Sequence, residues 1–451
     1  MGRFLNIGND SFAEIIRTDY VDKTGLIELI NKTIDTKNKL TCVSRPRRFG
    51  KSYAAQMLCA YYDCTCDSKT LFKNLSIEKY DDFETHLNKY NVIYIDITAF
   101  LSECISDGLS IANITSTLIE SLRKELIEAS GAPADASLYD SLISLVENTG
   151  RKIVFIIDEW DAIIRESKGN EKIQIAYLNF LRGIFKNGNI TTKVVAAAYM
   201  TGILPIKKDG TESAVSDFNE YSILNPAKFA EFTGFTEEEV KAFCEKNGLS
   251  ARDMKKWYDG YSFSGISSIY NPYSVMKAIE MESIESYWRG SSSTNALFQY
   301  VNMNYEGLQD DIVRLIAGES LTVDVNGFNN DVTNFKNKDD VLALLIHLGY
   351  LVYDNVERTA RIPNEEIKGE FLDLLKNSNG TRLAELVRAS DLLLKDTLAL
   401  NEDAVAEAID RIRNSNYAPT YYNNEQALRY IIKFAYITCV DQYFKVEELP
   451  S

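Results

Sequence analysis

The sequence predicts an α/β fold in which helices cover a parallel sheet. Short apolar runs alternate with longer segments of helical periodicity through the first half of the chain, as in strands joined by crossover helices. We expect strands at residues 39–44, 92–97, 153–157, 194–200 and 221–224. These runs are almost continuously apolar, as strands buried on both faces of a sheet require. Short buried helices are the alternative, which the β-branched residues and the length of the runs disfavour.

In the second half of the chain, helical patterns largely replace the strand patterns. A chain of 451 residues exceeds what one hydrophobic core usually supports, so we expect several domains. Strand signals largely stop near Ala227, and Thr236 followed by three glutamates marks the start of a helix. Further on, a helix ends at Gly349, a β-hairpin follows, and Pro363 and Asn364 open another helix, which is the outline of a winged helix. We therefore divide the chain into a P-loop-type α/β domain at residues 1–225, a helical lid at 226–305, a winged-helix-like α+β domain at 306–378 and a helical segment at 379–451.

Composition restricts the partners and the compartment. The formal net charge is -16, which argues against a basic footprint for nucleic acid or an anionic membrane over the whole protein. The seven cysteines are scattered, and beside Cys64 and Cys66, the only close pair, two histidines are too few for a zinc site. The N-terminus lacks the pattern of a signal peptide, and the longest apolar stretch, residues 194–206, is too short to cross a bilayer. We expect a soluble cytoplasmic protein that binds no membrane.

A phosphate-binding pattern follows the first expected strand. Residues 45–52 read R-P-R-R-F-G-K-S and end in Gly50, Lys51 and Ser52, where the strand gives way to a helix. This is the end of G-x-x-x-x-G-K-[ST], a loop whose N–H groups and helix N-terminus surround phosphates. Arg45 stands where the first glycine belongs, although glycine there allows positive φ and close approach to phosphate. We call residues 45–52 the phosphate loop.

The phosphate loop concentrates positive charge in an acidic chain. Arg45, Arg47, Arg48 and Lys51 place four cations within seven residues. Such a cluster is costly unless an anion approaches it, so we expect these side chains to bind the phosphates of ATP. A chance G-K-S in a basic surface loop is the alternative.

Each position of the loop has an expected role. Lys51 would contact the β- and γ-phosphates and act in catalysis, and Ser52 would ligate Mg²⁺. Phe49 and Gly50 complete the cofactor-binding segment.

A second motif supplies acids about a hundred residues downstream. The apolar run at residues 153–157 ends in Asp158 and Glu159. A carboxylate at the tip of a strand beside the phosphate-loop strand can hold Mg²⁺, and the following glutamate can orient a water molecule. We therefore assign Asp158 to the metal and Glu159 to catalysis. Asp96 competes for the metal role, but Ile97 follows it, so we place residues 92–97 as the strand inserted beside the metal strand.

Thr201 follows the strand expected at residues 194–200. Its hydroxyl could sense the γ-phosphate, so we add it to the cofactor-binding residues. A helix-capping or turn threonine is the equal alternative.

The combination of motifs resembles a known family, the predicted bacterial and archaeal AAA-ATPase-like proteins, which commonly carry a C-terminal PD-(D/E)XK nuclease-like domain. The matching segments, between about residues 10 and 300, are Y-V-D-K-T at 20–24, the phosphate loop, D-E-W-D at 158–161, F-A-E-F-T-G-F-T at 229–236, W-Y-D-G-Y at 257–261 and Y-N-P-Y at 270–273. The resemblance implies a P-loop ATPase of the additional-strand class, in which R-P-R-R-F-G-K-S is the usual form of the loop.

The resemblance also bears on the end of the chain. Glu425 could correspond to the first glutamate of the nuclease-like domain, but the chain stops at Ser451 before that domain's metal-binding residues. We expect a truncated chain or a natural form without the domain, and we predict no nuclease activity; DNA could be a partner through such a downstream domain.

Several aromatic and acidic residues have structural interpretations. We expect Trp257, Tyr258 and Tyr261 to pack within the lid rather than stack on bases. Residues 22–24 would either contact the nucleotide base or brace the phosphate loop. The winged-helix outline carries more acidic than basic residues, with Arg358 and Arg361 as the only basic wing candidates, so we favour an interdomain role over DNA binding.

The sequence therefore predicts a protein that binds ATP with Mg²⁺ and hydrolyses it to drive a conformational switch of an effector domain. Assembly into a homo-oligomer, with an arginine from a neighbouring subunit, is compatible with this function. The alternatives are a nucleotide-binding scaffold without turnover and a nucleic-acid-binding module that uses the arginine cluster. A small-molecule kinase is a minor option, because no second-substrate motif is present.

Overall fold

The protein is described from a computed structural model. The structure describes residues 2–167, 169–206, 217–263, 266–288, 307–326, 335–377 and 382–413, with single residues or pairs between and beyond these ranges. Within this described part, no helix is both long enough and apolar enough to cross a membrane.

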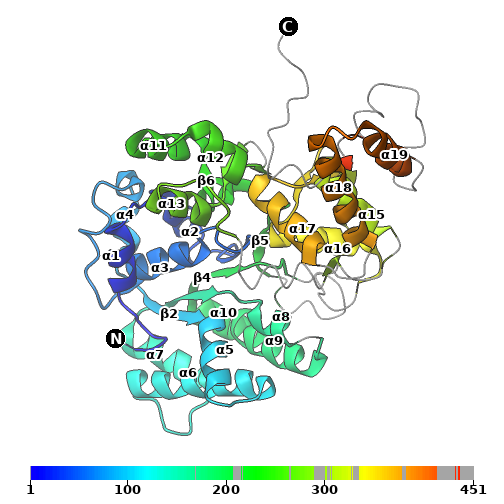
Figure 1. The fold of residues 1–451 in the computed structure, drawn as a ribbon. Helices are drawn as coiled ribbons and strands as arrows, with labels where there is room; N and C mark the ends of the chain where they lie inside the picture. The colour runs from blue at the N-terminus through cyan, green and yellow to red at the C-terminus, as the bar shows by residue number, and fades with distance from the viewer. Residues whose placement is uncertain are drawn as a thin grey trace.

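A five-stranded parallel sheet forms the centre of the N-terminal half (Figure 1). Its strands are β1 (Leu40–Ser44), β2 (Asn91–Asp96), β3 (Ile153–Asp158), β4 (Val195–Gly202) and β5 (Asn219–Tyr221). They lie in the order β2-β3-β4-β1-β5, and every pairing is parallel. The predicted α/β fold with a P-loop-type sheet is therefore confirmed.

The position of two strands differs from the expectation. Strand β4 lies between β1 and β3, so the strand that carries Asp158 is not adjacent to the phosphate-loop strand. Strand β2 lies beside β3, as expected, but it is the last named strand at that edge of the sheet, where Ile93 also forms a bridge with Leu5. Strand β4, and not the strand expected at residues 92–97, is therefore inserted between β1 and β3. Local sequence could not settle this order, because strands buried on both faces have the same apolar pattern.

The bounds of the first four strands agree with the expected ranges to within two residues, whereas the fifth does not. Strand β5 ends at Tyr221, where the expected strand begins. The apolar residues that suggested the later range, Ile223 and Leu224, pack instead into a core shared with the C-terminal half.

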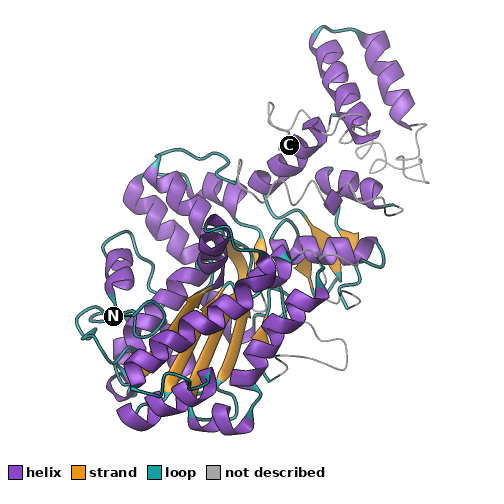
Figure 2. Ribbon diagram, turned by 90° about the horizontal axis from the view of Figure 1, so that it is seen from below, coloured by secondary structure: helices purple, strands orange, loops and turns teal. Residues whose placement is uncertain are grey.

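Helices cover both faces of the parallel sheet, as Figure 2 shows. Side chains of α1 (Asp10–Ile16), α2 (Gly25–Asn31) and α3 (Lys51–Tyr62) pack on one face. The other face is covered by α5 (Ile97–Ser106), α6 (Ile114–Ser130), α7 (Leu138–Thr149), α8 (Ala162–Glu166), α9 (Glu171–Phe185) and α10 (Gly188–Lys193). Short helices η1 (Ser76–Lys79), α4 (Phe83–His86) and η2 (Ile111–Asn113) lie in the connections.

The segment after β5 combines helices with a small sheet. It contains η3 (Ala227–Phe232), β6 (Phe235–Thr236), α11 (Glu237–Asn247), α12 (Ala251–Tyr258), β7 (Tyr261–Phe263), β8 (Ile266–Tyr270) and α13 (Pro272–Glu280). The antiparallel order β6-β8-β7 was not expected in a purely helical lid. Strands of two to five residues are too short to leave a clear period in the sequence. Thr236 is the N-cap of α11, as predicted, and it forms a capping box with Glu239.

The following elements are α15 (Leu308–Ile316), β9 (Leu321–Thr322), α16 (Lys338–Leu348), β10 (Val352–Asp354), β11 (Thr359–Arg361) and α17 (Glu365–Asn377). The three strands pair in the order β10-β11-β9. The expected order of helix, hairpin and helix is therefore present, with Gly349 in left-handed conformation at the end of α16. We call residues 308–372 the C-terminal unit.

Two antiparallel helices, α18 (Arg382–Leu398) and α19 (Glu402–Arg413), stand out from the rest of the molecule in Figure 2. The polar break expected at residues 414–424 and Glu425 lie outside the described residues.

Candidate nucleotide site

The phosphate loop joins β1 to α3. Gly50 caps the helix with φ of 80°, in the left-handed region, and its carbonyl accepts the backbone N–H of Ala54. A Cβ atom at this position would meet nothing within 4 Å, so glycine is required here by the backbone conformation rather than by space. Lys51 and Ser52 form the first turn of α3, where unpaired N–H groups favour an anion.

Lys51 is enclosed by oxygen atoms. Its side chain is 4% exposed, and its ammonium group donates to the carbonyl of Arg45 at 3.2 Å and to that of Pro46 at 2.9 Å. Oε1 of Glu159 lies 3.2 Å from the same nitrogen. The lysine therefore lies between its own loop and the end of β3, where it could exchange these partners for phosphate oxygens.

Asp158 ends β3 and is almost completely buried. The hydroxyl of Thr201 donates to Oδ1, and Oδ2 is buried without a hydrogen-bond partner of ordinary geometry in the described part of the chain. Burial raises the pKa of this carboxyl group, while the hydroxyls of Ser52 and Thr201 oppose the rise. A buried carboxylate oxygen with free acceptor capacity, beside a serine hydroxyl, fits the oxygen ligands that Mg²⁺ prefers.

Glu159 has a left-handed backbone, with φ of 53°. Such a conformation is uncommon for a residue other than glycine and is typical of functional sites. Its N–H donates to Oγ1 of Thr201, and its carboxylate lies between Lys51 and Arg165, whose Nη2 is 2.9 Å from Oε2. Burial tends to raise the pKa of Glu159, but the charges of Lys51 and Arg165 outweigh it, so the net shift is downward.

Asp161 and Arg165 support this arrangement, and sequence reasoning assigned them no role. Asp161 is fully buried and accepts the N–H groups of Ile203 and Leu204, after β4. Arg165 donates to Asp161 through Nε at 3.0 Å while it holds Glu159. The spacing of an acid and an arginine four residues apart on a helix was the available signal.

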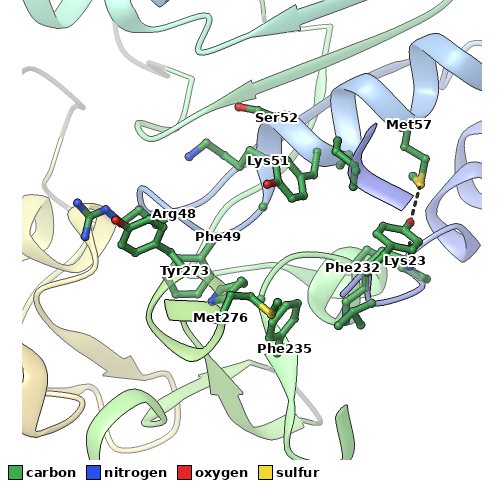
Figure 3. Close-up of a pocket in the computed structure, with 18 of the residues that line it drawn as sticks. Lys23, Arg48, Phe49, Lys51, Ser52, Met57, Phe232, Phe235, Tyr273 and Met276 are labelled. Carbon is green, nitrogen blue, oxygen red and sulfur yellow. Dashed lines mark hydrogen bonds between the residues drawn. The ribbon is translucent and has the colours of Figure 1, made fainter. Parts of the chain in front are cut away.

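A cavity of about 480 Å³ opens beside the loop (Figure 3). One end is lined by the phosphate loop and Glu159. The other end is largely apolar, and its wall comes from the N-terminal segment, α3 and the elements after β5; the lining side chains there include Ile15, Tyr20, Met57, Phe232, Phe235 and Met276. A cationic end and an apolar end in one cavity match the triphosphate and the base of a nucleotide.

Most of the loop residues predicted to bind the nucleotide line the cavity, but one does not. Arg47, Arg48, Phe49, Gly50, Lys51 and Ser52 line the cavity. Arg45 does not: its side chain is fully buried, and its guanidinium donates to the carbonyls of Ser44 and Tyr221 at 2.9 and 2.7 Å. Burial lowers the pKa of Arg45 to about 10. In this conformation main-chain carbonyls of β1 and β5 bind the Arg45 side chain, and it does not face the cavity where we expected it to bind phosphate.

Other predicted residues have supporting positions. Thr201 does not line the cavity; it connects Asp158 with the main chain of Glu159. Asp96 is the N-cap of α5 and accepts the N–H of Ala99. Helix capping therefore explains this aspartate without the metal role for which it was a candidate. Asp22 accepts hydrogen bonds from Thr24 and Ser76, which braces the N-terminal segment.

The W-Y-D-G-Y segment is mainly structural. Tyr258 and Tyr261 are fully buried, Trp257 is half-buried against the lid helices, and Tyr261 lies on β7 rather than on a helix. The prediction that these aromatic residues pack within the lid is confirmed for Tyr258. Tyr261 is also buried, but it packs in a core shared with Phe49 and the elements from α15 to α17.

Comparison with solved structures gives distant matches. The ORC2 protein of Aeropyrum pernix in ADPNP and ADP complexes has a TM-score of 0.36 and 11% identity, over 80% of this chain and 97% of its own. AMPPCP-bound DnaA from Aquifex aeolicus has a TM-score of 0.30 and 10% identity, over 88% of this chain and 97% of its own. Similarity at this level carries no functional information.

Comparison by sequence is more specific. No curated protein matches the chain. Residues 6–211 match the model of the family described as Predicted AAA-ATPase, a range that includes the phosphate loop, Asp158, Glu159 and Thr201. Residues 6–211 are therefore similar to the AAA-ATPase-like family.

Proposed function

We propose that the chain binds ATP with Mg²⁺ in the cavity beside the phosphate loop and hydrolyses it. The observation that carries this proposal is that side chains which follow β1 and β3 meet beside one cavity. Lys51, Ser52 and Glu159 line one end of it, and Asp158, which does not line the cavity, lies next to Ser52. The apolar end of the same cavity would receive the base.

The residues divide the chemistry among them. Lys51 would leave the carbonyls of Arg45 and Pro46 for the β- and γ-phosphate oxygens and stabilise charge there. Ser52 and Asp158 would hold Mg²⁺, which neutralises phosphate charge when bound. Glu159, kept ionised by Lys51 and Arg165, would orient the attacking water. Thr201 would act through Asp158 and Glu159 rather than by direct contact with phosphate.

Calorimetric titration of the chain with Mg-ATP, followed by phosphate release on the same sample, tests this function. We expect Lys51→Ala to weaken binding by roughly 10- to 100-fold, since a hydrogen bond to a charged group contributes about 1.5–3 kcal/mol. Lys39→Ala is the matched control, because that ammonium group also donates to two main-chain carbonyls but does not line the cavity. Glu159→Gln should bind ATP and lose turnover. A wild-type chain that binds no nucleotide would refute the proposal.

One observation favours a second function, a nucleotide-binding scaffold without turnover. Glu159 is paired with both Lys51 and Arg165, and a glutamate held in this way is not free to orient water. Tight Mg-ATP binding with no phosphate release in the wild type would select the scaffold.

A nucleic-acid-binding module has less support. Arg45 is buried and Arg48 is bound to the lid, so these two side chains of the cluster are not presented to a nucleic acid. Helix α16 of the winged-helix outline is buried over most of its length. We propose instead that residues 306–378 have an interdomain role.

We further propose the organisation set out from the sequence: an ATPase-like domain to residue 225, a lid to 305, a winged-helix-like domain to 378 and a C-terminal helical segment. In this proposal the protein works in the cytoplasm, and nucleotide turnover switches an attached or partner effector domain. Assembly into a homo-oligomer and DNA contact through a further domain belong to the same proposal.

A further inference from the structure

The phosphate loop is packed into the core of the C-terminal half rather than into the core of the parallel sheet. Phe49 is fully buried, and its ring meets that of Tyr261 edge-on at 5.0 Å between centroids. Both residues belong to a hydrophobic cluster that extends through α15, α16 and α17. The carbonyl of Phe49 also accepts the N–H of Gly234, just before β6. Movement of the loop would therefore disturb this shared core.

The end of α16 rests directly on the loop. A Cβ atom built on Gly349 would lie 2.7 Å from Cβ of Pro46, so glycine is required at this contact by space as well as by its φ of 88°. The hydroxyl of Tyr261 donates to the carbonyl of Gly349 at 2.7 Å. One tyrosine thus contacts the loop through Phe49 and the C-terminal unit through Gly349.

Arg48 makes the third connection. It has a left-handed φ of 68°, and its Nη1 donates to the carbonyl of Tyr287 at 2.9 Å. The guanidinium also lies over the rings of Tyr273 and Trp288, at 4.3 and 5.5 Å from their centroids. In Figure 3 the side chain points away from the apolar end of the cavity. Arg48 therefore lines the cavity while its charged group is bound to the lid.

Glu366 continues this connection into α17. Its Oε1 accepts the N–H groups of Tyr287 and Trp288 at 2.8 and 3.1 Å, and its Oε2 accepts the hydroxyl of Ser274 at 2.8 Å. Arg48 and Glu366 thus hold the same short segment, Arg48 through a carbonyl and Glu366 through two N–H groups. The carboxylate is 1% exposed, so water does not replace these partners.

We propose that the phosphate loop is the joint through which nucleotide binding controls the docking of the C-terminal unit, with Arg48 and Glu366 as positioning residues. The inference rests on the proposed nucleotide site and names what that site regulates. The loop conformation that presents Gly50 and the start of α3 to the cavity is the same one that carries the docking contacts of Pro46, Arg48 and Phe49. A nucleotide that binds this conformation raises the equilibrium constant for docking of the C-terminal unit. By linkage, docking raises the affinity for nucleotide by the same factor.

Hydrogen–deuterium exchange of the whole chain, with and without Mg-ATP, tests the joint. We expect nucleotide to slow exchange in peptides that contain Trp288 and the first turns of α17, although these lie outside the cavity lining. Nucleotide that binds, as calorimetry on the same sample shows, without any change in these peptides would overturn the inference and leave the proposed function standing. A chain that binds no nucleotide would overturn both.

A second experiment tests the reverse effect, in which loss of a docking contact lowers nucleotide affinity. Glu366→Ala removes the acceptor of two N–H groups, and we expect Mg-ATP affinity to fall by about 5-fold or more even though Glu366 does not line the cavity. Glu366→Gln keeps an acceptor oxygen and should restore the affinity. Asp340→Ala is the control, because Asp340 is a buried carboxylate that accepts the N–H of Lys336 at the start of α16, the opposite end of this helix from Gly349.

Two outcomes of the second experiment would contradict the joint. Equal losses of affinity in Glu366→Ala and Asp340→Ala would mean that general destabilisation is the cause. If Glu366→Ala does not fold, Tyr261→Phe replaces it, since this change removes only the hydroxyl that binds Gly349. Unchanged nucleotide-induced protection of α17 in Tyr261→Phe, together with unchanged affinity, would overturn the proposed coupling.

Discussion

The ammonium nitrogen of Lys51 lies 3.2 Å from Oε1 of Glu159, so the two residues assigned to phosphate contact and water orientation are partners of each other. Their side chains are only 4% and 19% exposed, so water and salt screen the pair weakly. If Lys51 moves to phosphate, Arg165 remains in an ion pair with Glu159, and the charge of Arg47 still acts on the carboxylate. The behaviour of Glu159 during turnover then depends on an arginine that does not line the cavity.

Arg165→Gln should shift the pH dependence of phosphate release. In the proposed mechanism Glu159 acts in its ionised form, and Arg165 helps to keep its pKa below the ordinary value of 4.5. Without this charge the pKa rises, so turnover should fall at a higher pH as the medium is acidified. Phosphate release measured from about pH 8 down to about pH 4 shows whether the acid limb of the variant begins at a higher pH than that of the wild type.

Arg165→Lys is the conservative control, because it keeps the positive charge and should restore most of the profile. An Arg165→Gln enzyme that is slower at every pH by the same factor would mean that the arginine has a structural role only.

Thr201→Val should weaken the site without a change in side-chain size. The threonine hydroxyl donates to Oδ1 of Asp158 and accepts the N–H of Glu159. Its loss leaves two buried groups unpaired, which costs roughly 1–3 kcal/mol each in stability. We expect a lower midpoint of urea unfolding and a higher Mg²⁺ concentration for half-maximal turnover. Thr201→Ser keeps the hydroxyl and should resemble the wild type, and a similar loss in both variants would contradict the assigned role.

The motifs of the site could be predicted because each is a local pattern at the end of one strand. Gly50, Lys51 and Ser52 directly follow β1, and Asp158 and Glu159 end or directly follow β3. The role of Arg45 could not be predicted in this way, because its partners are the carbonyls of residues distant in the chain, Tyr221 and Phe229.

The same distinction explains the fold. Long buried runs located four strands of the parallel sheet, but its order depends on pairing between segments more than a hundred residues apart, such as Leu40 with Ala198. The sheet β6-β8-β7 could not be predicted, because β6 has only two residues and leaves no periodic pattern in the sequence. The sequence predicted that Arg48 binds phosphate, because it lies in the basic loop. Its contacts with Tyr287 and Trp288 join segments that are far apart in the sequence and could not be predicted.

The W-Y-D-G-Y segment leads to a prediction about Gly260. This residue has φ of 111°, and a Cβ atom there would lie 2.0 Å from the carbonyl oxygen of Pro363, at the start of α17. Gly260→Ala therefore combines backbone strain with a main-chain clash, and we expect the free energy of unfolding to fall by more than about 3 kcal/mol.

Gly150→Ala is the matched control for this substitution. It also has positive φ, of 67°, but its Cβ atom would meet nothing within 4 Å. We expect it to cost only about 1–2 kcal/mol, the strain of a left-handed residue. Urea unfolding of both variants measures the difference, and equal losses would mean that α17 does not approach Gly260 as closely as the structure places it.

Glu366 should make stability depend on pH. Burial raises its pKa from an ordinary value of 4.5 to about 7, against the opposing hydrogen bonds from Ser274, Tyr287 and Trp288 and the charge of Arg48. The folded state therefore retains a proton that the unfolded state releases. Stability is fully present below about pH 4.5 and declines as the pH rises to about 7, by on the order of 3 kcal/mol.

Glu366→Gln cannot ionise, so its free energy of unfolding should lack this decline. Urea unfolding of the wild type and the variant at pH 5, 6, 7 and 8 gives the difference between them, in which the titration of His86 and His347 cancels because both proteins contain these residues. We expect the variant to gain stability relative to the wild type as the pH rises. A difference that is constant with pH would mean that Glu366 is ionised in the folded protein across the whole range, and that Arg48 and the surrounding N–H groups outweigh its burial.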